Sequence, residues 1–189
     1  MRCKNVRNNL QRHNIHVDDG TASWNHIQQF YHADKISPIR LAPKLTDHHI
    51  NVVSTTTMRV SLAAAGINMR VMTNELPGDA TSTADFVDKI DNLFDLLNSR
   101  AMKSDRPARC AVTAVNSNLA DLLALIAWVD KWIFWGIRVQ SRILCHWGLQ
   151  TSILNIHAMC QELMQEGFKF VCTARFNQDC LEIFFCWFA

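Results

Sequence analysis

Cysteine pairs are missing from this sequence, and their absence excludes a disulfide scaffold. Seven cysteines form no CxxC pair, and the eight histidines do not combine with them at zinc-ligand spacing. Cys160, Cys172 and Cys186 lie among apolar residues. We therefore expect buried free thiols in a reducing compartment, and we assign no metal site to cysteine or histidine.

Long apolar runs are also missing. The most apolar region, residues 119–137, is interrupted by Asp121, Asp130 and Lys131. Its longest uncharged run, residues 122–129, is far shorter than the ~20 residues that a bilayer requires. The first four residues are polar, which predicts no signal peptide. We expect a buried helix here and no membrane partner.

Charge of one sign is not in excess. Charged residues make up 19% of the 189 residues and the net charge is +2, so the chain as a whole is no polyanion binder. The N-terminal tract differs, because Arg2, Lys4, Arg7 and Arg12 precede the first acidic residue, Asp18. This tract is interpreted either as a solvated helix face or as a phosphate contact.

Hydrophobic periodicity predicts a mainly α fold. Val6 and Leu10 point inward from a first helix, and Ser23 caps a second helix that buries one aromatic face. Apolar residues at helical spacing, together with the glycines and prolines that end helices, predict six helices. These cover residues 3–14, 24 onward, 58–67, 83–99, 119–135 and 143–166. Turns are expected at 18–20 and 77–79, an irregular link between Pro38 and Pro43, and a helix stop at Gly167.

The helix over 83–99 is the most regular, and Thr81 or Ser82 is expected to cap it. Apolar residues form one stripe and aspartates lie away from it: Phe86, Ile90, Leu93 and Leu97, with Val87 and Phe94 beside them, against Asp85, Asp88, Asp91 and Asp95. Trp128, Trp132 and Trp135 are spaced as a core face. Residues 168–172 alternate as a short strand, and Asn177 can cap a final helix.

That final helix carries Asp179 and Glu182, three residues apart in an apolar run. The spacing puts both carboxylates on one helix face, where burial requires a cation or hydrogen-bond donors. The pair therefore indicates either a metal or nucleotide site, or an amphipathic helix with Glu182 in solvent.

Four segments occur in an order that resembles the P-element transposases, including the THAP-domain-containing transposase of vertebrates. They are residues 4–10 (KNVRNNL), 39–46 (IRLAPKLT), 84–86 with 93–95 (ADF, LFD), and 176–182 (FNQDCLE). No single segment decides the matter, but the four in order make the resemblance specific.

The resemblance implies an RNase H-like catalytic domain interrupted by a helical GTP-binding insertion, in a nuclear protein that binds transposon-end DNA and can self-associate. Residues 1–167 are then expected to be the insertion domain. Residues 168–189 are expected to be one short strand and one helix of the truncated RNase H-like C-terminal segment. A THAP zinc finger and two catalytic aspartates, which precede the insertion in that family, have no counterpart in this sequence.

The resemblance also implies site residues. Glu182 matches the third catalytic carboxylate, which would help to hold Mg²⁺. Phe94, Asp95 and Asn98 match a cluster that recognises the guanine of GTP. Asp179, Val60 and Lys44 match further nucleotide contacts, with Lys44 as the phosphate partner. About two helical turns of the family pattern are missing between Leu62 and Ile67.

One carboxylate cannot assemble a site that requires three, so we expect no strand transfer from this chain alone. Three interpretations stay open. The chain is a catalytically incomplete transposase copy, a non-catalytic, domesticated helical module that binds nucleotide or a protein, or a degenerate product without a function. Without the resemblance, the sequence predicts an all-α interaction domain with a tryptophan-rich core.

Overall fold

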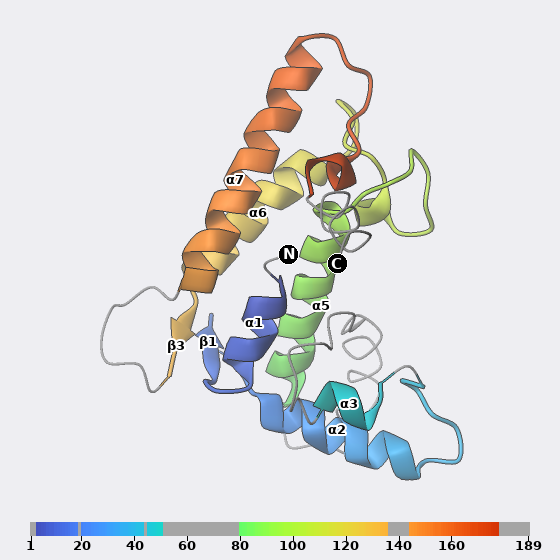
Figure 1. The fold of residues 1–189 in the computed structure, drawn as a ribbon, viewed down its shortest axis with the longest axis vertical. Helices are drawn as coiled ribbons and strands as arrows, with labels where there is room; N and C mark the ends of the chain where they lie inside the picture. The colour runs from blue at the N-terminus through green and yellow to red at the C-terminus, as the bar shows by residue number, and fades with distance from the viewer. Residues whose placement is uncertain (1–2, 19, 44, 51–79, 136–143, 178–189) are drawn as a thin grey trace, which may run out of the picture. The chain divides into compact units, whose positions relative to one another are not determined.

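The structure, a computed structural model, describes residues 3–18, 20–43, 45–50, 80–135 and 144–177. These residues are mainly helical with one small three-stranded sheet (Figure 1), which confirms the expected mainly α class. No helix in the described residues is long and apolar enough to cross a membrane. The chain divides into two compact units, described in turn below.

The N-terminal unit comprises Lys4–Asp91 and Lys131–Arg142. Its first helix, α1 (Cys3–Leu10), buries Val6 and Leu10 as predicted. The helix ends at Leu10 rather than near Asn14, because the following turn leads directly into a strand. The described helices and strands here are α1, β1 (Ile15–Val17), β2 (Gly20–Ala22), α2 (Trp24–Ile36), α3 (Asp47–Ile50), most of α5 (Ala80–Leu96) and β3 (Ile133–Phe134).

The sheet was not predicted. The expected turn at residues 18–20 joins β1 and β2 as a hairpin, with Asp18 at a positive φ of 50°. On its other edge β1 pairs antiparallel with β3, in the register Ile15 to Phe134. Strands of two or three residues are too short to show an alternating pattern, so the sequence did not reveal them.

Helix α2 follows the prediction closely. Ser23 is its N-cap, and its hydroxyl accepts a hydrogen bond from the backbone N–H of Asn25. Trp24, Ile27 and Phe30 are buried on one face together with Tyr31. The helix ends at Ile36 with Ser37 as its C-cap, just before Pro38, which cannot continue a helical hydrogen-bond ladder.

Helix α5 begins at Ala80, so Thr81 and Ser82 lie inside its first turn and do not cap it as predicted. Thr83 is buried instead, and its hydroxyl lies 2.7 Å from Nδ1 of His26. The predicted apolar stripe is confirmed, because Phe86, Val87, Ile90, Leu93 and Leu97 are all buried. Two residues differ from the prediction: Phe94 is exposed and Asp95 is buried.

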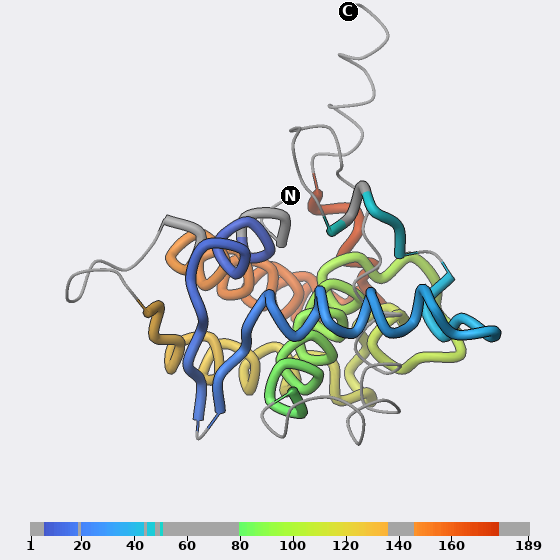
Figure 2. The backbone as a smooth tube through the Cα atoms, turned by 90° about the horizontal axis from the view of Figure 1, so that it is seen from below, coloured from blue at the N-terminus to red at the C-terminus, as the bar shows by residue number. Residues whose placement is uncertain are grey.

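The C-terminal unit comprises Asn92–Asp130 and Ile143–Ala189, with Met1–Cys3. Helices α6 (Asn118–Asp130) and α7 (Leu144–Gln165) pack against each other and run in opposite directions (Figures 1 and 2). The described part of the unit also contains two 3₁₀ turns, η1 (Pro107–Arg109) and η2 (Thr173–Phe176).

The apolar helix predicted over 119–135 is shorter than expected. It ends at Asp130, since Ile133 and Phe134 pair with β1 as strand β3. Trp128 and Trp132 are buried as predicted, and the Trp132 ring lies 5.2 Å from that of Phe86. Trp135 is 68% exposed, so its assignment to the core was wrong.

Gly167 ends α7 as predicted. It has φ of 96°, and its N–H bonds the carbonyl of Met164 while Phe168 N–H bonds that of Leu163, which is a Schellman cap. The strand predicted over 168–172 was wrong. Among the described residues, this segment forms only an isolated bridge, between Val112 and Val171, and no neighbouring strand extends the pairing.

Burial of the thiol is confirmed for Cys160 but not for Cys172. Cys160 is fully buried and free, and Cys110 and Cys172 are partly buried and free. Four predictions fall outside the described residues. They are the buried thiol of Cys186, the helix over 58–67, the turn at 77–79 and the helix after Asn177.

Candidate functional site

The last turn of α5 and the residues directly after it carry three of the predicted site residues. Phe94 is 40% exposed, whereas Asp95, its neighbour, is only 7% exposed. Asn98 follows the helix, and its side-chain amide donates to the Phe94 carbonyl at 2.8 Å. This bond satisfies a carbonyl that the helix end leaves without a partner. The three side chains therefore belong to one helix terminus that presents both an aromatic ring and polar groups.

Asp95 is held by two arginines of the following loop. Its Oδ2 accepts from Nε of Arg109 at 2.8 Å and from Nη1 of Arg106 at 3.2 Å. The Asp95 side chain is 9% exposed, against 35% for Arg106 and 50% for Arg109. Oδ1 of Asp95 forms no hydrogen bond to any described residue. A carboxylate this buried requires such partners, since desolvation penalises an unpaired charge.

The 3₁₀ turn η1 fixes the positions of Arg106 and Arg109 in this loop. Pro107 occupies the first position of that turn, where its missing N–H is no loss, and Arg109 ends it. Arg106 and Arg109 are thus three residues apart on a fixed 3₁₀ turn. Its spacing predicted that Asp95 lies with the other, more exposed aspartates of α5. The two arginines explain why it is buried instead.

A second segment reaches the same helix end from far along the chain. Nδ2 of Asn177 donates to Oδ1 of Asn98 at 3.1 Å. Asn177 follows η2 and stands two residues before Asp179, a predicted nucleotide contact. The structure therefore brings the segment leading to Asp179 against the end of α5, as far as residue 177.

Ser99 and Thr173 join these segments, and we call their contact the Ser99–Thr173 clamp. The Thr173 hydroxyl donates to the Leu96 carbonyl at 2.5 Å and accepts from Ser99 N–H at 3.0 Å. In return, the Ser99 hydroxyl accepts from Thr173 N–H at 3.1 Å. Both side chains are buried, so these bonds satisfy groups that water cannot reach.

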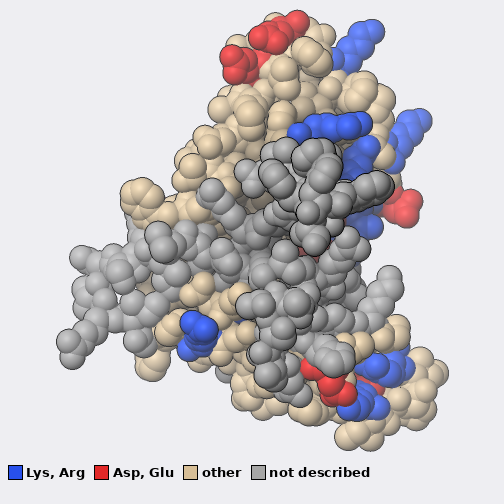
Figure 3. All heavy atoms as spheres, in the orientation of Figure 1, with Lys and Arg blue, Asp and Glu red and all other residues tan. Residues whose placement is uncertain are grey.

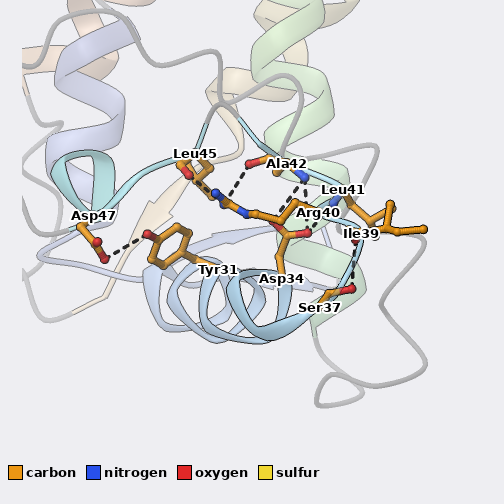
Figure 4. Close-up of polar contacts among 9 residues, drawn as sticks. All are labelled: Tyr31, Asp34, Ser37, Ile39, Arg40, Leu41, Ala42, Leu45 and Asp47. Carbon is orange, nitrogen blue, oxygen red and sulfur yellow. Dashed lines mark hydrogen bonds and ion pairs between the residues drawn. The ribbon is translucent and has the colours of Figure 1, made fainter.

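The loop that carries Lys44 is built around Asp34, which is fully buried at the end of α2 (Figure 4). Its carboxylate accepts from the N–H groups of Leu41 at 2.5 Å and Ala42 at 3.3 Å. Arg40 Nε also donates to it at 3.2 Å, and Arg40 Nη2 donates to the carbonyls of Ala42 and Leu45. One carboxylate therefore organises the backbone of the loop on both sides of Pro43.

Asp47 connects α3 to α2 on the same loop. Its carboxylate accepts from the Tyr31 hydroxyl and from Lys35 Nζ, each at 3.0 Å (the Tyr31 contact is drawn in Figure 4). The hydrogen bond from Lys35, followed by that from Tyr31, lowers the pKa of Asp47. The same bond to Asp47 raises the pKa of Lys35. Both side chains are more than half exposed, so the pair orients the loop and adds little stability.

The two described arginines of the basic N-terminal tract, Arg7 and Arg12, differ in exposure. Arg7 is buried, bonds the Asn8 side chain, and has its pKa lowered by desolvation. For Arg7, both the solvated helix face and the phosphate contact were therefore wrong, while Arg12 is exposed. Arg2 and the side chain of Lys4 lie outside the described residues.

Four predicted site residues, Lys44, Val60, Asp179 and Glu182, lie outside the described residues. In the described part of the chain, no three His, Cys, Asp or Glu side chains come close enough to hold a metal ion. The sequence missed Arg106, Arg109 and Asn177. The spacing of the two arginines around Pro107 was a signal for a shared partner, whereas Asn177 gave none.

Comparison with known proteins assigns the family. A model of the TNP-like, GTP-binding insertion domain matches residues 2–110, more than half of the chain. The chain belongs to the TNP-like GTP-binding insertion domain family. The matched range of this domain includes Phe94, Asp95, Asn98 and both arginines, but ends before α6, α7 and η2.

The fold of this GTP-binding insertion domain protein resembles a solved transposase. A chain of the Drosophila P element transposase strand transfer complex superimposes with a TM-score of 0.80 at 22% identity. The match covers 97% of this chain and 43% of that chain, so this chain spans less than half of the transposase chain. Among curated proteins, none matches. The resemblance to P-element transposases stated from the sequence is thus confirmed.

Proposed function

We propose that this chain binds GTP at the end of α5, as the GTP-binding region of a P-element-type transposase. The family match over residues 2–110 carries this proposal, because it names the domain and includes the end of α5. The geometry supports it through three neighbouring groups: an exposed aromatic ring, a buried carboxylate and an amide, in Phe94, Asp95 and Asn98.

The chemistry of these groups suits guanine. Guanine presents an N1–H and an exocyclic amine on one edge, and a carboxylate can accept from both. In Asp95 the Oδ2 atom is shared by two guanidinium groups, while Oδ1 has no hydrogen bond to a described residue. The base would approach Oδ1, with the Phe94 ring available for stacking. Adenine presents an acceptor at N1, so Asp95 would reject ATP.

The remaining nucleotide contacts of the proposal are Lys44 for phosphate, with Val60 and Asp179. The loop before Lys44 is fixed by Asp34 and Arg40, which is a suitable support for a lysine that must meet a phosphate. These three nucleotide contacts are proposed because of the family resemblance.

The wider proposal concerns transposition. We propose residues 1–167 as the insertion domain and residues 168–189 as the start of an RNase H-like segment in a nuclear DNA transposase. Glu182 would contribute one Mg²⁺ ligand there, and the other ligands would come from outside this chain. Self-association, DNA binding and any cleavage therefore belong to the proposed whole protein, whereas GTP binding requires no catalysis and suits a domesticated module equally.

A nucleotide titration tests the proposal. We expect saturable binding of fluorescent GTP to the full chain, with ATP about 10-fold weaker or worse. Asp95→Asn should weaken GTP by about 10- to 100-fold, the range for a hydrogen bond to a charged group. Asp105→Asn in the same loop is the matched control and should bind GTP normally. Equal affinity for GTP and ATP, or normal binding by Asp95→Asn with unchanged melting temperature, would refute the proposed base contact.

A further inference from the structure

The turn η2 lies against the end of α5 and is bound to it at two points. Thr173, its first residue, is held by the buried Ser99–Thr173 clamp. Asn177, its C-cap, donates from Nδ2 to Oδ1 of Asn98 at 3.1 Å. Because Asn98 and Ser99 are neighbours in the chain, the two contacts fix the turn against successive residues. The clamp therefore helps to set the position of Asn177.

The hydrogen bonds around Asn98 have a fixed direction. The Phe94 carbonyl can only accept, so the nitrogen of the Asn98 amide must face it, at 2.8 Å. The oxygen of the same amide then faces Asn177, which must present its own nitrogen. The Phe94 carbonyl thus holds one end of the amide, and Asn177 holds the other.

One N–H of Asn98 remains for a ligand. Its Nδ2 carries two hydrogens, and no described residue other than Phe94 accepts a hydrogen bond from it. Oδ1 of Asp95 likewise has no hydrogen bond to a described residue. The backbone N–H of Asn98 bonds the Asp95 carbonyl at 3.1 Å, and at this spacing the two side chains are neighbours. The end of α5 therefore presents one donor beside one acceptor.

Charge at this end of α5 does not select a base. The loop after the helix carries Arg100, Lys103, Arg106 and Arg109. Figure 3 shows Lys and Arg atoms gathered at the upper right of the view, where Figure 1 draws the segment between α5 and α6. Such a positive field attracts any nucleoside triphosphate alike. Selection between purines must therefore come from hydrogen bonds to the base edge.

The donor and the acceptor match one purine edge. Guanine presents its O6 acceptor beside the N1–H, whereas adenine presents an amine beside an acceptor nitrogen. With the guanine N1–H on Asp95, O6 meets the remaining N–H of Asn98. Adenine in the same orientation would place its amine against that N–H.

We infer that Asn177 is a positioning residue that sets purine selectivity through Asn98. By bonding Oδ1, it prevents the amide from turning about its bond to the Phe94 carbonyl, so the N–H faces position 6 of the base. An amide released at this end could turn its oxygen toward the amine of adenine. The inference rests on the proposed GTP binding and adds to it a residue beyond the matched range, which ends at residue 110.

Competition titrations of GTP and ATP on the full chain test the inference, with the ratio of the two dissociation constants as the readout. Asn177→Ala and the isosteric Asn177→Asp both remove the donor, and each should lower the preference for GTP about 3- to 10-fold. The ratio compares nucleotides of equal charge, so the charge added by Asn177→Asp cancels. Asn116→Ala is the matched control, because it removes a 2.7 Å bond to the Ala111 carbonyl in the same unit. It should leave the ratio unchanged.

A double-mutant cycle locates the effect. In an Asn98→Ala background the amide is gone, so adding Asn177→Ala should change the ratio by less than about 2-fold. A full further loss in that background would overturn the inference, because Asn177 would then act by another route. An unchanged ratio in both Asn177 variants, or an equal fall in Asn116→Ala, would overturn it while the proposed GTP binding stands. A parent chain that binds GTP no better than ATP would refute the proposed base contact and the inference together.

Discussion

Asn177 donates to Asn98 at 3.1 Å although 79 residues separate them in the chain. Asn98 in turn donates to the Phe94 carbonyl, so its amide is oriented from both sides. The residue that leads into the predicted Asp179 contact is therefore connected to the α5 terminus that carries the predicted base contacts.

Replacing Thr173 with valine should lower the free energy of unfolding by about 2–3 kcal/mol. Valine keeps the shape but removes the hydroxyl, which leaves Ser99 N–H and the Leu96 carbonyl buried without this partner. Thr173→Ser keeps the hydroxyl and should cost only about 1 kcal/mol. Urea denaturation measures both, and equal losses in the two variants would contradict the role given to the hydroxyl.

Arg109→Gln should weaken GTP binding about 3- to 10-fold while leaving the weak ATP binding unchanged. The substitution removes the 2.8 Å bond that orients the Asp95 carboxylate, and the half-exposed arginine contributes little to stability. Arg109→Lys should restore part of the affinity. Competition titrations with GTP and ATP provide the measurement. A similar loss in Arg100→Gln would indicate a general effect of charge instead.

Asp34→Ala should destabilise the N-terminal unit by about 3 kcal/mol, because it leaves Arg40 and two loop N–H groups without their buried acceptor. Asp47→Ala, on the same loop but more than half exposed, should have a much smaller effect. Chemical denaturation compares the two. Equal effects would show that burial of Asp34 is not what fixes this loop.

Cys160 should make stability depend on pH in the alkaline range. Burial raises the pKa of its thiol from 9.0 to about 11. The folded state therefore holds this proton more tightly than the unfolded state, and the contribution is complete below pH 9 and lost as pH rises through 11. Over that window the free energy of unfolding of the parent should fall by about 2 kcal/mol more than that of Cys160→Ala. Parallel curves for the two proteins would contradict the prediction.

Local signals in the sequence predicted α2 and the stripe of α5 correctly. Ser23 caps α2 through its own hydroxyl, and the apolar spacing of α5 is set by helix geometry alone. The position of Gly167 likewise follows from its freedom to adopt a φ of 96°. In each case the sequence within one or two turns contains the physical cause.

The misses have long-range causes. Residues 168–172 alternate like a strand, yet a strand needs a partner, and only Val112 pairs with Val171. Trp135 fits a helical face by spacing, but pairing between β1 and β3 ends the helix earlier. Asp95 was assigned to an outer face because its partners, Arg106 and Arg109, reach it across a proline-containing loop. No periodic pattern records such contacts.

The pairing of β1 with β3 has a consequence for how the domain is delimited. The family match ends at residue 110, yet the strand that completes the N-terminal sheet is Ile133–Phe134. A polypeptide cut at the family boundary would expose the outer edge of β1, and it would also lose Trp132 from the side of Phe86. During synthesis the hairpin must likewise wait for more than a hundred further residues before its sheet can close. The range that the family model matches and the range that completes this sheet therefore have different ends.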